Sequence, residues 1–187
     1  MESRMKSAVL MLAVMALLTL TGCNGTCSVS NPTSTPGPTP SSPNEWTWVS
    51  GARTANQAGS YGTLGTAAPG NVPGARAGAM SWMDADGNLW LFGGEGFSST
   101  WAGTTPYQND LWKFSGGEWT WMGGSNVGGL MGTYGTLGTP ASGNVPGGRV
   151  GAATWVDNSG NLWLFGGFGD DSTGKSGDLN DLWEYQP

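Results

Sequence analysis

The stretch GNLWLFGG occurs twice in this chain of 187 residues, at positions 87–94 and, letter for letter, at positions 160–167. The offset that carries the first occurrence onto the second also carries Trp46 onto Trp119, so the similarity extends beyond the repeated word. Self-similarity at a fixed period indicates repeated supersecondary units. We therefore expect the part of the chain that follows residue 44 to contain two repeats of one structural unit.

Each repeat predicts four short antiparallel strands. The first strand covers about residues 77–83 and, in the second repeat, 150–156. It ends at a turn in which Asp86-Gly87 or Ser159-Gly160 is a two-residue hairpin signal. The word GNLWLFGG is then the second strand. Its central residues LWLF are all apolar, so we expect burial on both faces and a strand that ends at the two glycines.

The third strand is predicted at NDLWKF (residues 109–114) and NDLWEY (residues 180–185), where the second copy comes slightly earlier than the common offset requires. The fourth is predicted at EWTWMG (residues 118–123), with Trp119 and Trp121 on one face because side chains alternate along a strand. Trp46 and Trp48 have the same spacing in EWTW (residues 45–48), which predicts another copy of the fourth strand.

Four-stranded antiparallel units with periodic glycine and aromatic residues predict an all-β fold and are typical of β-propeller blades. The order of arginine, strand, turn, Gly-Gly strand end, NDLW and later tryptophan resembles the kelch repeat. The resemblance is to bacterial secreted kelch proteins related in fold to the galactose oxidase propeller, and it covers residues 45–187 as two repeats, about 45–117 and 118–187. The residues that carry it are Arg76, Gly93, Gly94, Trp112, Trp119, Arg149, Gly166, Gly167 and Trp183.

The strand order along the chain is a fourth strand, one full blade, and the first three strands of another blade. Propellers usually contain four to eight blades, and two blades alone would leave two apolar outer faces open. Two alternatives follow. In a homo-oligomer the leading strand of one chain could complete the last blade of the next chain and close a ring. The other alternative is a shortened propeller with no independent activity.

Positions 1–22 predict a signal peptide, because Arg4 and Lys6 precede an apolar run that is too short for a comfortable membrane span. The ending LTGC resembles a bacterial lipobox, which implies that Cys23 receives a lipid. The alternative is a plain secretory signal cut nearby, which leaves Cys23 and Cys27 free to pair. Residues 23–44 predict a flexible linker rich in Pro, Ser and Thr. We expect an exported protein that is lipid-anchored in the cell envelope or secreted.

The composition argues against several classes of function. Seven Lys and Arg stand against 13 Asp and Glu, for a net charge of −6 without a basic cluster, so nucleic acid and anionic lipid headgroups are poor partners. The chain has no histidine, the commonest general base and transition-metal ligand. Galactose oxidase chemistry would need copper-binding histidines and a cysteine-linked tyrosine, so it is not implied here. We expect no cofactor and no metal. The turn DADGN with Glu95 imitates a calcium loop, but its glycine is at the fourth position instead of the sixth, and the second repeat has Phe168 where Glu95 stands.

The long loops at residues 51–75 and 95–108 are expected on one face, where binding is usually carried. The repeated YGTLGT…GNVPG segment either presents Tyr61 and Tyr134 to a ligand or plugs one aromatic ring between blades. We expect Arg76 and Arg149 to be buried partners of an ion pair or of carbonyls, and Asp110 and Asp181 to bond the backbone at a strand entrance. Residues that do not repeat are the preferred binding candidates: Trp101, Tyr107, Asp170, Asp171 and Lys175.

The leading hypothesis is a non-enzymatic cell-envelope lipoprotein whose kelch repeats bind another envelope protein or a polysaccharide. An alternative is a carbohydrate-active enzyme that uses acidic residues of the long-loop face, such as Asp170 and Asp171.

Overall fold

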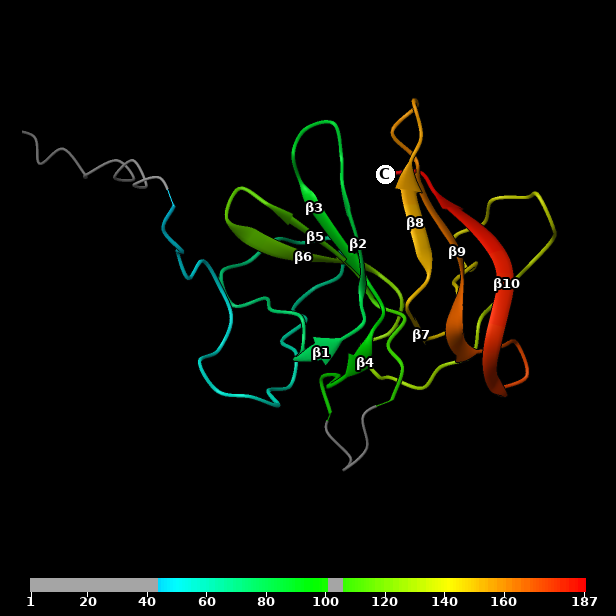
Figure 1. The fold of residues 1–187 in the computed structure, drawn as a ribbon, viewed down its shortest axis with the longest axis horizontal. Helices are drawn as coiled ribbons and strands as arrows, with labels where there is room; N and C mark the ends of the chain where they lie inside the picture. The colour runs from blue at the N-terminus through cyan, green and yellow to red at the C-terminus, as the bar shows by residue number, and fades with distance from the viewer. Residues whose placement is uncertain (1–43, 101–105) are drawn as a thin grey trace, which may run out of the picture. The chain divides into compact units, whose positions relative to one another are not determined.

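Antiparallel strands form all the regular structure in residues 44–100 and 106–187, which are the residues described by a computed structural model (Figure 1). Trp46–Pro187 form one compact unit. The signal peptide, Cys23, the linker up to residue 43 and Trp101 lie outside the described residues. Within the described ranges there is no helix of the length and hydropathy needed to cross a membrane.

The first sheet is a four-stranded meander. Its strands are β2 (Met80–Met83), β3 (Leu89–Phe92), β5 (Leu111–Ser115) and β6 (Glu118–Gly123), paired in that order. This agrees with the predicted four antiparallel strands. Trp121 pairs with Trp112 and lies on one face with Trp119, as the two-residue spacing predicted.

The predicted first strand is broken in the structure. A short ribbon of β1 (Arg76–Ala77) and β4 (Glu95–Gly96) lies beside the first sheet, and the chain turns at Gly78 before β2 begins. Gly78 has a φ of 63°, a left-handed conformation that glycine adopts without strain. The long loop after the Gly-Gly pair therefore starts with a strand, which the sequence did not indicate.

The second sheet contains β7 (Arg149–Val150), β8 (Ala153–Val156), β9 (Leu162–Asp170) and β10 (Ser176–Tyr185). Both β7 and β8 pair with β9, which pairs in turn with β10. The predicted end of the second strand at the glycines is wrong here, because β9 continues through them to Asp170. A bulge between Leu179 and Leu182 of β10 absorbs the irregularity.

Residues 45–48 are not a strand, which contradicts the prediction made from EWTW. Trp46 and Trp48 are exposed. Among the described residues β10 pairs only with β9, so the edge of β10 that faces away from β9 has no partner strand. The sheets of this part of the chain are all antiparallel but do not close into a ring.

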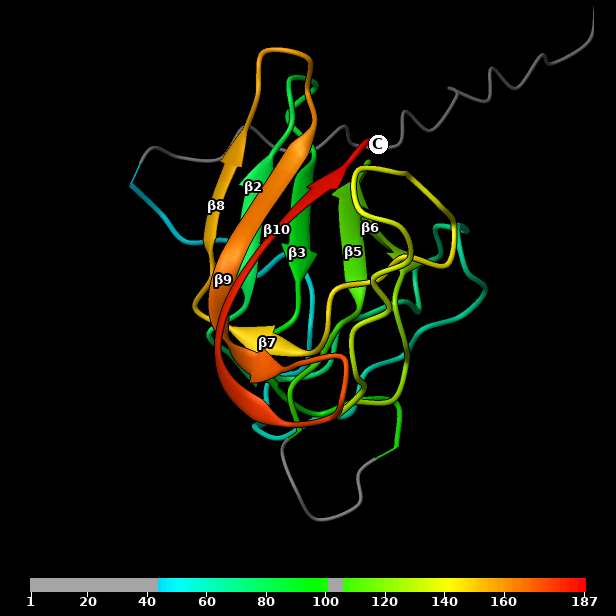
Figure 2. The same cartoon turned by 90° about the vertical axis from the view of Figure 1, so that its right-hand side faces the viewer.

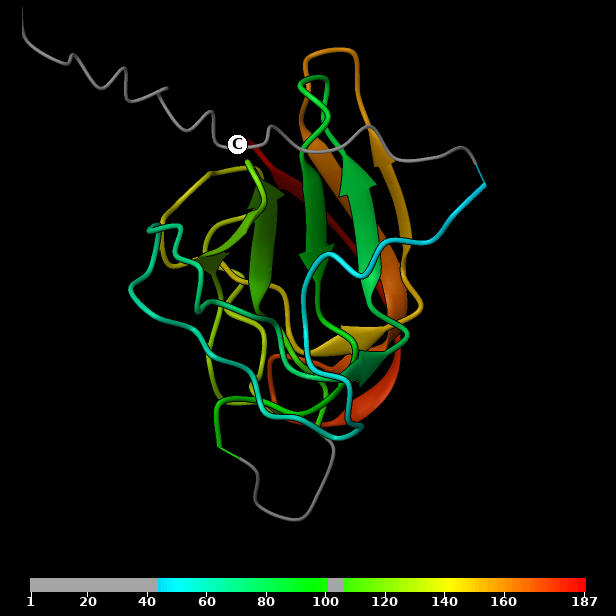
Figure 3. The ribbon, with the colours of Figure 1, turned by 90° about the vertical axis from the view of Figure 1, so that its left-hand side faces the viewer.

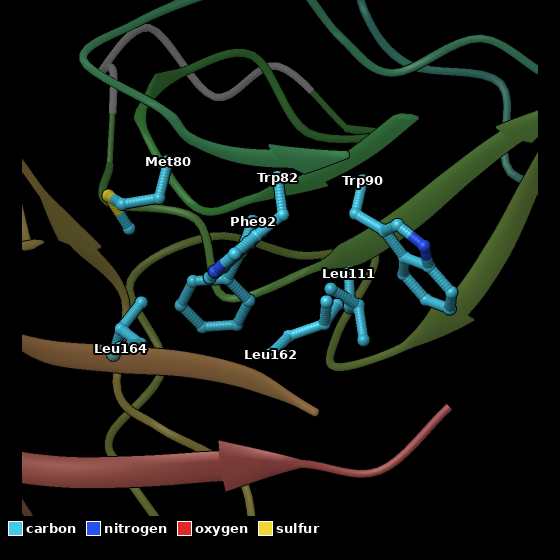
Figure 4. Close-up of a cluster of buried hydrophobic side chains, with 7 residues drawn as sticks. All are labelled: Met80, Trp82, Trp90, Phe92, Leu111, Leu162 and Leu164. Atoms are coloured by element: carbon cyan, nitrogen blue, oxygen red, sulfur yellow. The ribbon is translucent and has the colours of Figure 1, made fainter. Parts of the chain in front are cut away.

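The core lies between the two sheets. Five side chains of the first sheet meet two leucines of β9 there (Figure 4). β2 lies beside β8, and the β2–β3 and β8–β9 hairpins point the same way (Figures 2 and 3). The Trp82 indole donates a hydrogen bond of 3.0 Å to the Trp163 carbonyl and joins the sheets directly. The cluster consists of Met80, Trp82, Trp90, Phe92, Leu111, Leu162 and Leu164.

The repeated word buries opposite faces in its two occurrences. In β3 the buried residues are Trp90 and Phe92, whereas in β9 they are Leu162 and Leu164. Leu89 is 47% exposed although its equivalent Leu162 is 2% exposed. The predicted burial of both faces is therefore wrong for each strand taken alone, because each sheet has a neighbour on one side only.

Candidate functional site

A buried polar cluster lies next to Gly93 of the first sheet. Arg76 donates to the Asp110 carboxylate through Nη1 at 2.6 Å and through Nη2 at 2.8 Å. The same carboxylate accepts from the Tyr61 hydroxyl at 2.6 Å and from the Trp112 indole at 2.7 Å. Arg76 also donates to the carbonyls of Gly74 and Gly93. Arg76 is thus the buried partner of an ion pair and of carbonyls, as predicted.

The second sheet repeats the cluster with the same geometry. Arg149 donates to Asp181 at 2.6 and 2.8 Å, and Asp181 accepts from Tyr134 and from Trp183, each at 2.7 Å. Burial alone would raise the pKa of Asp181. The hydrogen bonds from Arg149, Trp183 and Tyr134 outweigh it and lower that pKa to about 2.

The prediction for Asp110 and Asp181 was wrong, since both carboxylates bond side chains and not the backbone at a strand entrance. A bidentate arginine and two further donors fill the acceptor positions of each carboxylate. Neither carboxylate is left to take a proton from a substrate or to bind a sugar hydroxyl. Through Tyr61 and Tyr134, the clusters hold the two YGTLGT…GNVPG segments against the sheets.

Tyr61 is a core residue and not a ligand-facing one. It is 5% exposed, and its ring packs against Trp112 at 4.8 Å and edge-on against Trp121 at 5.3 Å. Burial and the neighbouring Asp110 carboxylate raise the pKa of Tyr61 well above its ordinary value. Tyr134 makes the equivalent contact with Trp183 at 5.0 Å but is 37% exposed. Tyr61 is thus a packed ring and not a ligand-facing one, but it packs against its own sheet and not between two blades as the second interpretation predicted.

The calcium-like turn is a plain hairpin. The Asp84 carboxylate accepts from the Trp90 indole at 2.8 Å and from the backbone and side-chain N–H groups of Asn88. Although burial opposes ionisation, these bonds lower the pKa of Asp84 to about 2. In the described part of the chain, no three or more His, Cys, Asp or Glu side chains group as metal ligands.

Asp170 and Asp171 serve the β9–β10 hairpin. Asp170 is buried and accepts from the Ser176 hydroxyl at 2.6 Å. Asp171 accepts from the Thr173 N–H and hydroxyl, each at 2.7 Å, and from the Lys175 N–H at 3.0 Å. These bonds hold the pKa of Asp171 below its ordinary value, with the Thr173 hydroxyl contributing most. The two neighbouring carboxylates therefore stabilise a turn and do not converge on a common point.

A shallow depression of about 280 Å³ follows this hairpin along the start of β10. Asp171 and Lys175 line it, so two of the sequence candidates do lie together. Asp178, which also lines it, pairs in register with Phe168 of β9. Phe168 is exposed and packs edge-on against Tyr107 at 5.9 Å. We call Tyr107, Phe168, Asp171, Lys175 and Asp178 the hairpin surface.

Sequence reasoning missed Phe168 and Asp178. Phe168 entered only as the residue that stands where Glu95 stands in the first repeat, and the strand that continues through Gly166 and Gly167 was not expected. The available signal was that Phe168 is a large apolar residue in a segment that does not repeat. Once β9 and β10 extend past the glycines, the pairing register places both residues beside the depression.

A scan against models of protein families finds no match for this chain, and a search of curated proteins finds no similar protein.

Proposed function

We propose that this protein is an exported, lipid-anchored kelch-type propeller protein that binds a polysaccharide of the cell envelope through the hairpin surface, without catalysis. The observation that carries the proposal is the aromatic pair of Tyr107 and Phe168 beside a depression lined by charged side chains that do not repeat. Residues that repeat in both sheets are occupied in building the fold. Specificity must then come from residues that differ between them.

The chemistry of this surface suits a sugar polymer. An exposed aromatic ring offers a flat apolar face to a pyranose ring, and the carboxylates and ammonium of Asp171, Asp178 and Lys175 can bond its hydroxyls. A depression with a few polar groups beside an aromatic ring is a common form of ligand site. The chain's net charge of −6 favours a neutral polymer over an acidic one.

Two observations support binding without hydrolysis. A glycosidase needs two carboxyl groups that face the scissile bond at a fixed separation. Asp170 is buried and bonded to Ser176, and Oδ1 of Asp171 accepts three bonds from its own turn, which leaves Oδ2 for a ligand hydroxyl. A pair in which one carboxyl group is withdrawn from the surface cannot place both groups on one scissile bond.

The kelch assignment and the anchor rest on the sequence. The arginines, glycine pairs and tryptophans of the motif recur at fixed spacing, and the all-β sheets are compatible with blades. An anchor at Cys23 followed by a Pro/Ser/Thr-rich linker would hold the hairpin surface away from the membrane, in reach of envelope polymers.

The experiment is binding of the full chain in detergent to an array of neutral envelope polysaccharides. Phe168→Ala should weaken binding by about tenfold, since a stacked ring contributes about 1–1.5 kcal/mol. Val127→Ala is the control, because Val127 is also an exposed apolar residue but lies outside the hairpin surface and outside both sheets.

Absence of glycan binding by the unchanged chain would contradict the proposal. Capture of an envelope protein that depends on Phe168 would favour a protein ligand instead. Release of reducing sugar that disappears in an Asp170→Ala, Asp171→Ala double variant would favour the enzyme.

A further inference from the structure

The first sheet contains a strand pair, β5 with β6, whose two equivalents in the rest of the chain are unpaired. These equivalents are the exposed edge of β10 and the segment 45–50. In the first sheet, β6 begins with the word EWTW and pairs with β5, so that Trp119 lies opposite Phe114 and Trp121 opposite Trp112. The same word stands at residues 45–48, where it forms no strand. β10 carries the equivalents of β5, with Trp183 and Tyr185 in place of Trp112 and Phe114.

The loop segment 59–74, which we call the first strap, also contacts the fourth strand β6. The Gly65 N–H donates to the Trp121 carbonyl at 2.8 Å, and the Asn71 side chain donates to the Trp119 carbonyl at 3.0 Å. The Tyr61 ring packs against Trp121. The fourth strand is therefore held on one edge by β5 and from the side by the strap.

The second strap, residues 132–147, has the same receiving geometry. Its Asn144 side chain donates to the Thr139 carbonyl at 3.0 Å, as Asn71 does to Thr66 at 2.9 Å. Gly138 stands at the position of Gly65, and Tyr134 packs on Trp183 as Tyr61 packs on Trp112. Among the described residues no strand lies in this position, which explains why Tyr134 is far more exposed than Tyr61.

Segment 45–50 already has part of the conformation that pairing requires. The Trp48 indole donates to the Ser50 carbonyl at 2.8 Å, and the Trp121 indole donates to the Gly123 carbonyl in the same way at 2.7 Å. Both tryptophans of the segment are exposed. Preorganisation of this kind lowers the entropy lost on binding.

The segment lies on the wrong side of its own chain to reach β10. Ser50 and Gly51 line a depression with Leu91 and Trp119. Leu91 alternates along β3 with Trp90 and Phe92, which face the second sheet, so this depression is on the opposite face of the first sheet. The first sheet thus separates the segment from β10, and another chain is the occupant that the geometry favours.

Exposed apolar residues on the outer faces of the two sheets also favour contact with a second copy of the chain. Trp155, Phe165 and Leu182 are exposed on the outer face of the second sheet, at positions whose equivalents Trp82, Phe92 and Leu111 are buried. Met83 and Leu89 are exposed on the outer face of the first sheet, where the equivalents in the second sheet contact the core. Stacking one chain's second sheet on another chain's first sheet would repeat the internal contact.

We infer that residues 45–50 of one chain pair with β10 of another as its fourth strand, with the second strap of the receiving chain closing over Trp46 and Trp48. Such a contact is heterologous, so it continues until a ring closes. A propeller of four to eight blades would need about two to four chains. The inference does not depend on the hairpin surface, because β6 in the first sheet pairs only with the part of β5 equivalent to residues 182–186.

Cross-linking tests the register. Lys113 pairs with Thr120, so the inference places Glu184 opposite Thr47 of the other chain. Full chains that carry Thr47→Cys or Glu184→Cys, each with a different tag and with Cys23→Ala and Cys27→Ala, are co-expressed and oxidised in detergent. We expect a disulfide-linked dimer that carries both tags. The pair Thr47→Cys with Asp178→Cys is out of register and should give none.

The positive control is Lys113→Cys with Thr120→Cys in one chain, which should form an internal disulfide. A formed control without the mixed dimer would overturn the inference. So would an internal disulfide in a chain that carries both Thr47→Cys and Glu184→Cys but forms no dimer, since the chain would then receive its own strand. A product that links Glu184→Cys to a different protein would overturn it too and assign the edge to that protein.

Light scattering of the unmodified full chain in detergent gives a second readout. We expect a protein mass of two to four chains. Trp48→Ala and Tyr134→Ala should each weaken association by at least tenfold, whereas Val127→Ala, an exposed apolar residue outside the contact, should not. A chain that is monomeric at all concentrations would overturn the inference even if all variants fold.

Discussion

Trp82 and Trp155 occupy equivalent positions in the two repeats, yet Trp82 is 8% exposed and Trp155 is 44% exposed. Trp82 packs among the core side chains between the sheets and donates to the Trp163 carbonyl. Trp155 stacks on Trp163 at 6.0 Å and otherwise faces away from the first sheet. Equal sequence has produced unequal environments because only one sheet has a neighbour on that side.

Alanine substitutions at these two tryptophans should therefore differ in their effect on stability. Trp82→Ala leaves a cavity in the core and should cost about 3–5 kcal/mol of unfolding free energy. Trp155→Ala should cost less than about 1 kcal/mol. Urea unfolding at low protein concentration, where chains are dissociated, measures both. Equal losses would mean that Trp155 is buried within the single chain.

The two arginine–aspartate clusters provide a second comparison. The side chains of Arg76 and Asp110 are 6% and 0% exposed, and those of Arg149 and Asp181 are 0% and 14% exposed. Asp110→Ala leaves a buried arginine without its counter-ion and should destabilise the chain by about 3–5 kcal/mol. Asp181→Ala should cost less, because Asp181 is itself partly exposed and its removal lets water enter beside the buried Arg149 guanidinium. Thermal unfolding of both variants beside the unchanged chain decides the order.

The strands of the first sheet could be predicted because pattern and turn chemistry agree there. Alternation in EWTWMG and the Asp86-Gly87 turn correctly placed β6 and the β2–β3 hairpin. The break at Gly78 could not be predicted, since it depends on the pairing of β1 with β4 in a separate ribbon. The continuation of β9 through Gly166 and Gly167 likewise depends on β10 as a partner on both sides of the bulge.

The candidate site was predicted less well than the fold. Lys175 and Asp171 do lie together, but Tyr61 is a core residue and Asp170 is a buried residue at the end of β9 that bonds Ser176. The role of Asp110 as a shared acceptor for Arg76, Tyr61 and Trp112 could not be read from the sequence. Tyr61 lies 49 positions from Asp110, and only the packed strap brings them together.

Gly124 and Gly123 are neighbours that should respond differently to alanine. A Cβ on Gly124 would collide with the Asn109 carbonyl, and its φ is 71°. A Cβ on Gly123 meets nothing within 4 Å. Gly124→Ala should lower the unfolding free energy by at least about 2 kcal/mol, and Gly123→Ala by less than about 0.5 kcal/mol. Urea midpoints of the two variants test this, and a loss for Gly124→Ala no larger than that for Gly123→Ala would show that the close approach is relieved at no cost.

The proposed lipid anchor at Cys23 predicts that the protein partitions into detergent. The unchanged protein, expressed with its signal sequence in a bacterial host, should enter the detergent phase of a phase-separating detergent. Cys23→Ala should move it to the aqueous phase, because a covalent lipid provides its membrane affinity. Cys27→Ala is the matched control and should stay with detergent. A Cys23→Ala protein that still partitions into detergent would refute the anchor.

Acid should destabilise the second sheet through Asp181. The folded-state pKa of about 2 lies below the ordinary value of 3.8, so the charged carboxylate stabilises the folded chain at pH values above 3.8. That contribution is lost as the pH falls from about 4 to about 2. Asp84, whose pKa is also about 2, adds a loss in the same window.

Urea unfolding of the unchanged chain at several pH values should therefore show a free energy that falls across this range. Asp181→Asn should be less stable at neutral pH and should show a shallower fall, because one of the linked protons is removed. An unchanged slope in Asp181→Asn would mean that the carboxylate has the same pKa in the folded and unfolded chain. The bonds from Arg149, Tyr134 and Trp183 would then not select its charged form.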